Sequence, residues 1–286
     1  MRFAFIEKHL DAFPVRIMAE VLAVSESGFY AWRTRPESDR SLRDRQLLPT
    51  VRSIHAEYDA TCGSRRLVDE LTAHGAPCGR HRARRLMRLA QVTVETKKKF
   101  RVTTDSKHAL PVAENVLNRE FATTAPNQRW AADITYLWTN EGWLYLAVVL
   151  DLYSRMIVGW SLKERMTRDL VDDALTMALW RRKPKPGLLH HSDRGSQYCA
   201  LDHQRLLQQH GITVSMSRKG NCWDNACVES FFHTLKVERV YRRRYATRDQ
   251  ARLDVLSYLA FYNGRRRHST LGNQCPLEFE AMRKSA

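Results

Sequence analysis

Three consecutive runs of β-branched and aromatic residues, joined by short polar turns, constrain the fold of this chain more than any other feature. They are RWAADITYLW (129–138), WLYLAVVLDL (143–152) and MIVGWSL (156–162). Runs of this composition predict β-strands, and turns of so few residues join antiparallel neighbours. From residue 167 onward, helical patterns alternate with short apolar runs at 188–192 and 212–215. The sequence therefore predicts an α/β domain with a mixed five-stranded sheet and flanking helices.

Three acidic residues stand at positions of this domain where a metal site would need them. Asp133 lies in the middle of the first predicted strand, Asp193 ends the run LLHHSD, and Glu229 lies on a helix predicted over 225–240, which Asn221 or Asp224 could cap. Taken singly, each acid could be a surface carboxylate. A carboxylate inside an apolar strand is nevertheless costly to bury unless it is paired or bound to a metal.

The chemistry of such a group of acids is that of a hard metal site. Carboxylates without an evident histidine or cysteine ligand set favour Mg²⁺ or Mn²⁺. Two such ions, roughly 4 Å apart, can activate the attacking oxygen and stabilise the leaving oxygen in a phosphoryl displacement. We therefore expect Asp133, Asp193 and Glu229 to be both the catalytic residues and the metal ligands.

The formal net charge of +16 favours a polyanionic partner, because basic side chains neutralise phosphates and release their counterions. Nucleic acid is the leading candidate, although charge alone also fits an enzyme that is merely basic. No apolar run approaches the roughly 20 residues of a membrane span, and the N-terminus lacks the order of a signal peptide. We expect a soluble, cytoplasmic protein with no membrane partner.

Two pairs of helical patterns precede the predicted sheet. Residues 13–22 and 25–32 form the first pair, with Ser25 as a cap, and fit either a DNA-binding helix-turn-helix or two short packing helices. The second pair, 64–74 and 80–89, ends in a helix with five arginines. Its cationic face is either solvated or in contact with DNA, and we favour DNA. The arginines expected to contact DNA are Arg80, Arg82, Arg84 and Arg85.

Polar sequence without periodicity, including Lys97 to Lys99, predicts a linker after the basic helix. Beyond the sheet, a helix is predicted over 248–262, and the basic run Arg265, Arg266 and Arg267 is interpreted as an ordered loop that faces DNA. The expected organisation is an N-terminal helix-turn-helix region (1–45), a second, basic helix-turn-helix-like region (46–95), a linker (96–121), a catalytic core (122–240) and a C-terminal helical and basic tail (241–286).

The segments around the three acids resemble a known signature. WAADITY, HHSDRGSQY and SRKGNCWDNACVESFFHTLK resemble the D, D-35-E motif of integrases and transposases, and 35 residues do separate Asp193 from Glu229. The start FIEKHLDAFPVRIMAEVLAVSESGFYAW and the tail LAFYNGRRRHSTLGNQCPLEFE resemble the second-frame protein of the insertion-sequence-three family of bacterial transposases. The resemblance covers nearly the whole chain.

This resemblance implies an RNase H-like catalytic core preceded by all-α helix-turn-helix regions. It implies a DDE-type polynucleotidyl transferase that cuts DNA at the ends of an insertion sequence and joins a 3′-hydroxyl to target DNA, with two Mg²⁺ or Mn²⁺ ions on the three acids. Lys236, two helical turns after Glu229, resembles a lysine that contacts DNA near the cut end. The family also implies a nucleoid-associated bacterial protein, a homo-oligomer on DNA, and a first-frame protein or fusion as partner.

Two alternatives and one departure accompany this interpretation. The chain could be a non-catalytic DNA-binding regulator of transposition or a host-adopted derivative, although all three acids are present. A ribonuclease of RNA–DNA hybrids would share the core but leave the N-terminal helices and basic tail unexplained. Retroviral integrases carry an N-terminal zinc module, and no histidine and cysteine spacing of that kind is present, so no structural zinc is expected.

Overall fold

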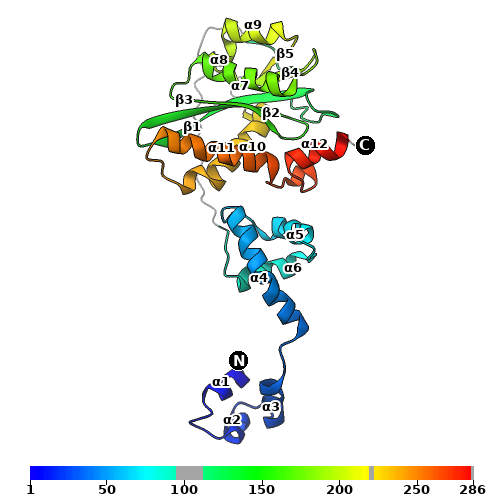
Figure 1. Ribbon diagram of the computed structural model, residues 1–286, viewed down its shortest axis with the longest axis vertical. Helices are drawn as coiled ribbons and strands as arrows, with labels where there is room; N and C mark the ends of the chain where they lie inside the picture. The colour runs from blue at the N-terminus through cyan, green and yellow to red at the C-terminus, as the bar shows by residue number, and fades with distance from the viewer. Residues whose placement is uncertain (95–111, 219–221, 285–286) are drawn as a thin grey trace.

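The computed structural model of the chain describes residues 1–94, 112–218 and 222–284, which form two helical units followed by a sheet domain (Figure 1). The N-terminal helical unit contains α1 (Arg2–Lys8), α2 (Val15–Val21) and α3 (Glu26–Thr34). The second helical unit contains α4 (Asp39–Glu57), α5 (Ser64–Ala73) and α6 (Arg80–Leu89). None of the helices in the described ranges is long and apolar enough to cross a membrane.

The sheet domain contains a mixed sheet of five strands, as predicted. The strands are β1 (Arg129–Thr139), β2 (Gly142–Asp151), β3 (Ile157–Lys163), β4 (Leu189–Ser192) and β5 (Thr213–Met216). Their order is β3-β2-β1-β4-β5. The first three form the predicted antiparallel meander, whereas β4 and β5 run parallel to β1 because helices connect them.

Helices cover both faces of this sheet (Figure 1). One face packs against α7 (Arg168–Arg182), α8 (Ser196–Cys199) and α9 (Leu201–Gln209), and the other against α10 (Ala226–Glu238) and α11 (Arg248–Gly264). Side chains alternate between the two faces along β1. Trp130 and Ala132 belong to the core on the α7 to α9 side, and Ala131 belongs to the core on the α10 and α11 side. The short 3₁₀ turns are η1 (Cys222–Asn225), η2 (Val240–Arg242) and η3 (Ser269–Leu271).

The last helix, α12 (Pro276–Lys284), docks on the sheet domain. Its Glu280 is 5% exposed and accepts hydrogen bonds from Arg182 at 2.8 and 2.9 Å and from the Ser154 hydroxyl at 2.6 Å. Arg182 also reaches Asp151, at 3.3 Å. A charged network therefore fixes α12 against α7 and the end of β2.

Helix α4 is an element that the sequence did not predict, and it crosses the expected boundary between residues 45 and 46. The reason is that charged residues and an internal Pro49 interrupt its apolar stripe. Ser38 caps the helix by accepting a hydrogen bond from the Ser41 N–H at 3.3 Å. The buried Val51 and Ile54 pack with apolar residues of α5 and α6, so α4 to α6 share one small core.

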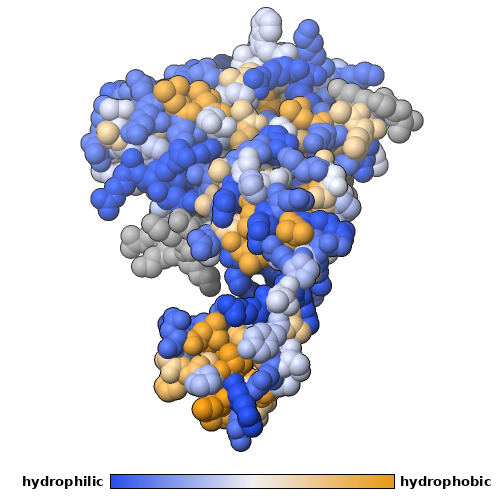
Figure 2. Space-filling model, turned by 60° about the horizontal axis from the view of Figure 1, so that its bottom comes forward, coloured by the Kyte–Doolittle hydropathy of each residue, from blue (hydrophilic) through white to orange (hydrophobic). Residues whose placement is uncertain are grey.

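The N-terminal unit confirms that Ser25 caps α3, and it explains why residue 28 is a glycine. The Ser25 hydroxyl accepts a hydrogen bond from the Gly28 N–H at 2.9 Å. A Cβ at position 28 would lie 2.6 Å from that hydroxyl and 3.3 Å from the Phe3 ring. The glycine therefore makes room for the cap and for α1, despite its low helix propensity. Figure 2 shows apolar residues gathered on the outside of this unit, where Ile17 and Val21 are exposed.

The second half of the expected linker packs on the sheet domain. Leu117 is 1% exposed, belongs to the core on the α10 and α11 side, and its N–H donates to the Ser215 hydroxyl at 3.0 Å. Residues 112–121 therefore belong structurally to the catalytic domain. The Lys97 to Lys99 run, also placed in the expected linker, lies outside the described residues.

Candidate active site

The parallel pairing of β1 with β4 brings Asp133 and Asp193 to the same level of the sheet. Ala131 pairs with His191, and the two aspartates follow two residues later on their respective chains. The Asp133 carboxylate accepts a hydrogen bond from the Ile134 N–H at 2.7 Å, and the Asp193 carboxylate accepts one from the Gly195 N–H at 2.9 Å. Residues 60 positions apart in sequence thus become neighbours.

Gly195 lets the Asp193 carboxylate fold back over the chain. A Cβ at residue 195 would stand 3.0 Å from the Asp193 Oδ1 and 3.1 Å from the Gln197 Oε1. These separations are tighter than ordinary van der Waals contacts, so a side chain there would press on the carboxylate. The DRG sequence therefore supplies both the acid and the space it occupies.

The third acid, Glu229, lies in the first turn of α10. The side-chain amide of Asn225, the N-cap residue, donates a hydrogen bond to the carbonyl of Ala132 at 3.1 Å. Because Ala132 directly precedes Asp133, this bond ties the start of α10 to β1 beside the first acid. Asn225 makes no side-chain capping bond, and the Asp224 carboxylate binds other donors, so the expected capping by Asp224 is wrong. Asn221 lies outside the described residues.

Asp224 has a different task, which the sequence did not reveal. Its buried carboxylate accepts hydrogen bonds from Arg119 at 3.0 Å, from Asn115 at 2.8 Å and from the N–H and guanidinium of Arg218 at 2.9 to 3.1 Å. Burial alone would raise the pKa of Asp224, but the bonds from Arg218 and Arg119 outweigh it and hold the pKa well below its usual range. This network locks residues 115–119 beside the start of α10.

The three acids differ sharply from Asp224 in their electrostatics. Burial, then repulsion from Asp193 and Glu229, raises the pKa of Asp133 well above its usual range. Burial also raises the pKa of Glu229. Lys236 acts in the opposite direction on Asp133, while burial lowers the pKa of this lysine, whose ammonium lies 5.1 Å from the centre of the Tyr136 ring. At Asp133, repulsion from the neighbouring acids therefore exceeds the attraction of Lys236.

The donor set fits a hard divalent cation. All three side chains are carboxylates, and the repulsion that raises the Asp133 pKa is the kind that a bound cation removes. Among residues 1–94, 112–218 and 222–284, no three His, Cys, Asp or Glu side chains already converge closely enough to hold a metal. A cation would therefore have to draw the carboxylates together.

Aromatic and histidine side chains fill the space beneath the two aspartates. Tyr198 is 2% exposed, and both Asp133 and Asp193 contribute, after burial, to raising its pKa. His190 and His203 pack against it, with ring centres 6.4 and 5.6 Å away. Burial lowers the pKa of His190 to about 3, so its ring is neutral at physiological pH. His190 therefore lies in the core, away from any DNA.

Its neighbour His191 is also fully buried and tied down locally. The two ring nitrogens lie 2.9 Å from the Ser215 hydroxyl and 3.1 Å from the Ser217 hydroxyl. Ser215 belongs to β5 and Ser217 directly follows it, so the His191 side chain links β4 to β5. Local packing therefore holds both histidines.

The four arginines predicted on α6 divide into two pairs. Arg82 donates to the carboxylate of Asp44 at 2.9 Å, and Arg85 pairs with the same carboxylate, which is 2% exposed. Arg80 and Arg84 are exposed, and the neighbouring Arg84 charge lowers the pKa of Arg80. Two of the predicted side chains thus fasten α6 to α4, and the other two face solvent.

The predicted arginine run after α11 lies at the junction between the second helical unit and the sheet domain. Arg265 donates to Glu57 at 2.6 Å, Arg266 to Glu238 at 2.8 Å through two nitrogens, and Arg267 to Glu70 at 2.5 Å. These bonds join residues up to 208 positions apart. Arg265 and Arg267 thus join the sheet domain to the second helical unit, whereas Arg266 binds Glu238 within the sheet domain, an acid that Arg66 of α5 also reaches.

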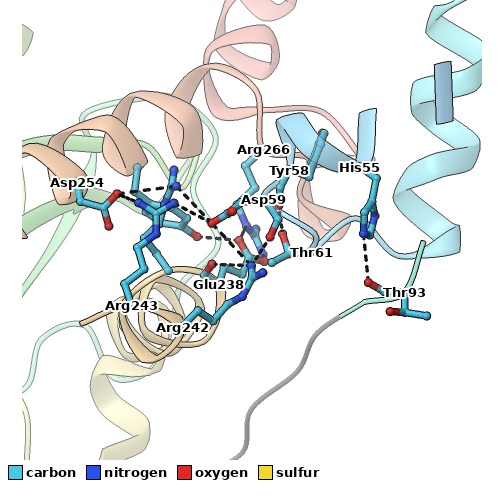
Figure 3. A network of polar contacts seen from close by, with 12 residues as sticks. His55, Tyr58, Asp59, Thr61, Thr93, Glu238, Arg242, Arg243, Asp254 and Arg266 are labelled. Carbon is cyan, nitrogen blue, oxygen red and sulfur yellow. Dashed lines mark hydrogen bonds and ion pairs between the residues drawn. The ribbon is translucent and has the colours of Figure 1, made fainter. Parts of the chain in front are cut away.

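The same junction continues along the chain after α10 (Figure 3). Asp59 accepts hydrogen bonds from Arg239 at 3.3 Å and Arg243 at 3.1 Å, and its backbone carbonyl pairs with Arg242. Tyr58 stacks edge-on against Phe261, with ring centres 5.2 Å apart. The junction is therefore dense in charge and has an aromatic contact at its centre.

Comparison with known families defines the class of protein. Two models described as Integrase core domain match residues 123–222 and 210–276, and one described as HTH-like domain matches residues 41–100. A protein of Shigella sonnei, the insertion element IS600 uncharacterized 31 kDa protein, is 49% identical over 92% of this chain and 97% of its own length. Transposase InsF for insertion sequence IS3A, from Escherichia coli strain K12, is 45% identical over 98% of both chains.

Two solved structures are similar to this chain at low sequence identity. The catalytic core of BIV integrase is 20% identical with a TM-score of 0.43, over 56% of this chain and 97% of that one. A chain of the simian T-cell lymphotropic virus intasome in complex with PP2A regulatory subunit B56 gamma is 17% identical with a TM-score of 0.49, over 80% and 73%.

The chain belongs to the insertion-sequence-three family of transposases, as its full-length relatives show. It is a DDE-type transposase with an integrase-type catalytic core behind a helix-turn-helix-like domain. The fold class, family and enzyme class expected from the sequence are thereby confirmed.

Proposed function

We propose that this transposase cuts DNA at the ends of its insertion sequence and joins the freed 3′-hydroxyl to target DNA, using Asp133, Asp193 and Glu229 as ligands of two Mg²⁺ or Mn²⁺ ions. The observation that supports this best is that Asp133 and Asp193 follow the paired residues Ala131 and His191, and that the charges of Asp193 and Glu229 both raise the pKa of Asp133. A carboxylate repelled in this way suits a hard cation.

The metal ions, when bound, would supply activation of the attacking oxygen and stabilisation of the leaving oxygen. The residues of the chain have their own parts. Asn225 orients the first turn of α10, and Gly195 holds the Asp193 carboxylate through its N–H. Lys236 adds positive charge beside Asp133 and is placed to attract a DNA phosphate. Tyr198 and His190 exclude water from the floor of the site.

DNA binding is proposed for the second helical unit and α10. Arg80 and Arg84 are the exposed members of the predicted α6 set and the best candidates for phosphate contacts. Arg82, Arg85 and Arg265 to Arg267 would support DNA binding by holding the helices in place, or would contact DNA only after release from their acids. We further propose that the protein acts in the bacterial cytoplasm at the nucleoid, as a homo-oligomer on DNA, with a first-frame protein or fusion as partner.

The test is a cleavage and joining assay on labelled duplexes carrying the ends of the element, with Mg²⁺, and with and without the upstream-frame fusion. Asp133→Asn, Asp193→Asn and Glu229→Gln should each lower activity by at least about 10³-fold, since each removes an anionic ligand oxygen worth several kcal/mol in the transition state. DNA binding should stay nearly unchanged. A variant that keeps near-wild-type cleavage would remove that residue from the ligand set.

The same assay separates the alternatives. DNA binding by the wild-type protein without cleavage, in the presence of the fusion partner and Mg²⁺, would indicate a non-catalytic regulator. Hydrolysis of an RNA–DNA hybrid without joining of DNA would indicate a ribonuclease.

A further inference from the structure

A cavity of about 360 Å³ lies where the second helical unit meets the end of α10, apart from the three catalytic acids. One wall is the start of α5, from Gly63 to Arg66, with Thr61 just before it and Arg80 of α6 beside it. Val237 and Glu238, the last two residues of α10, form the other wall. Figure 3 shows Thr61 and Glu238 next to each other at this junction.

The cavity is cationic because its single acid is already neutralised. Glu238 accepts hydrogen bonds from Arg66 at 3.2 Å, from Arg266 at 2.8 Å and from the Tyr258 hydroxyl at 2.8 Å. Arg65 and Arg80 have no acidic partner in the described part of the chain, and the charge of Arg65 contributes to lowering the Arg80 pKa. Two guanidinium groups thus repel each other at the rim of a concave surface.

The backbone adds to this positive potential. Helix α5 has Gly63 as its N-cap, no side chain in the described part of the chain caps it, and Gly63 and the first three residues of the helix line the cavity. The positive end of a helix dipole favours an anion at this position. Arginine is suited to the same ligand, since its fork of donors matches phosphate oxygens.

We propose that this cavity binds one phosphodiester group of the DNA backbone, held by Arg65, Arg80 and the first turn of α5. This inference rests on the proposed function, because it takes the DNA to be the duplex that enters the active site. The site would register that duplex against α10, the helix that carries Glu229 and Lys236.

The geometry of α10 gives the expected position of this phosphate. Eight residues separate Glu229 from Val237, which is about 12 Å along a helix at 1.5 Å per residue. Successive phosphates of one strand advance about 3.4 Å along the duplex axis. For DNA that follows α10, the bound phosphate lies roughly three to four nucleotides from the bond that is cut.

The first experiment measures affinity against salt for the full-length protein and a terminal duplex of the element. Arg65→Ala and Arg80→Ala should each weaken binding and lower the slope of log K against log salt by about 0.9, the value of one lost contact. The matched control is Lys185→Ala, an exposed lysine in the loop after α7, on the face of the sheet away from the helical unit. Equal losses in this control, or unchanged slopes, would overturn the site.

A second variant separates a real cavity from a diffuse positive field. Ser64→Leu fills the cavity at the first residue of α5 without a change of charge, and it should weaken DNA binding several-fold while the melting temperature stays close to that of the wild type. A diffuse field would not respond to this substitution. Unchanged affinity in a folded Ser64→Leu protein therefore contradicts the proposal.

The third experiment locates the phosphate. Methylphosphonates, which lack the charge, are placed singly at each of about ten terminal positions. One or two adjacent substitutions, roughly three to four nucleotides from the cut, should weaken wild-type binding but have little further effect on Arg80→Ala, because both changes remove one contact. If every methylphosphonate weakens binding by the same factor in Arg80→Ala as in the wild type, Arg80 does not contact any of these phosphates and the proposal is rejected. Stabilisation of the wild type by inorganic phosphate, without any methylphosphonate effect, would assign the cavity to a free anion instead.

Binding is measured in these experiments without chemistry, so their outcome is independent of catalysis. Absence of cleavage and joining by the wild-type protein would refute the proposed function while leaving the cavity results interpretable. Unchanged DNA affinity in all three cavity variants, beside normal joining, would refute only the cavity.

Discussion

Two groups of buried acids in this molecule are surrounded in opposite ways. At the junction, Glu238 receives hydrogen bonds from Arg66, Arg266 and Tyr258, and these outweigh burial so that its pKa is lowered. In the active site, Asp133 is raised in pKa by burial and by the acids beside it. Glu238 is thus saturated with protein donors, whereas the acids beside Asp133 repel its charge more strongly than Lys236 attracts it.

The difference teaches where a cation or anion can bind. A saturated acid such as Glu238 has no attraction left for a metal, and its value is structural. An unsaturated group such as Asp133 with its neighbours costs stability in the free protein, and this cost is recovered only when a cation arrives. The charge of the residues is the same, so their partners decide the function.

The largest expected effect is the loss of stability when Glu238, the acid saturated with hydrogen bonds, is removed. Glu238→Ala leaves Arg66 and Arg266 without their shared acid, and removing one partner of a buried ion pair typically costs about 3–5 kcal/mol. The melting temperature should fall by on the order of 10 °C. Differential scanning calorimetry measures this fall. A change below a few degrees would mean that the junction is not a stabilising contact.

The next prediction concerns Asp133 and its neighbouring acids, and tests whether a cation stabilises the protein there. Mg²⁺ at about 100 times its dissociation constant should stabilise the wild type by about 2.7 kcal/mol, because it binds only the folded state. Asp133→Asn should lose most of this gain, and its metal-free form should melt no lower than the wild type, since one repelling charge is gone. Melts with Mg²⁺ and with a chelator provide the test. A full Mg²⁺ gain in Asp133→Asn would show that this acid binds no metal.

Opposite pH dependences should follow from the opposite pKa shifts. A raised pKa, as at Asp133 and Glu229, contributes stability at low pH that is lost as the pH rises through the shifted value. A lowered pKa, as at Glu238, contributes stability at neutral pH that is lost as the pH falls through it. In metal-free protein, Asp133→Asn should therefore gain on the wild type as the pH rises above the usual pKa of an aspartate, whereas Glu238→Gln should be at its greatest disadvantage near neutrality.

Urea unfolding at a series of pH values, with a chelator present, measures how the free energy of unfolding of each variant changes with pH. If the two variants differ from the wild type by the same amount at every pH, neither acid has a shifted pKa and the contrast between the two groups disappears.

The smallest effects concern α6, where Asp44 is another saturated acid. Arg82→Ala should cost about 1–2 kcal/mol, because the buried Asp44 loses one of its charged donors. Arg84→Ala, with an exposed and unpaired side chain on the same helix, should change stability by less than about 0.5 kcal/mol. Chemical denaturation compares the two directly. Equal stability losses would indicate that Arg84 has a structural partner as well.

The sequence carried enough information for the sheet and most helices, and it named the three acids on which the proposed function depends. Alternation and β-branched residues identified β1 to β5 to within one or two residues, and the spacing from Asp193 to Glu229 matched a known signature. Helix α4 was missed because its charges and Pro49 break the apolar stripe that reveals a helix. The spacing of apolar residues reveals a helix only when one of its faces is buried, and α4 buries few apolar side chains.

The partners of the arginines could not be predicted for a different reason. Arg265 and Glu57 are 208 positions apart, and nothing local marks either as half of a pair. A run of three arginines looks the same in a sequence whether it faces DNA or acids on three other helices. The same holds for Asp224, whose partner Arg119 lay in a segment interpreted as linker.

The arginine and acid junction also limits how transposases of this kind could exchange parts during evolution. The helix-turn-helix-like domain and the integrase core match separate family models, which suggests interchangeable cassettes. Yet Asp59 and Glu70 on one side are matched to Arg243 and Arg267 on the other. A recombinant that inherits the helices from one relative and the core from another would bring unmatched charges together. We therefore expect these positions to have diversified as a unit, with changes on one side compensated on the other.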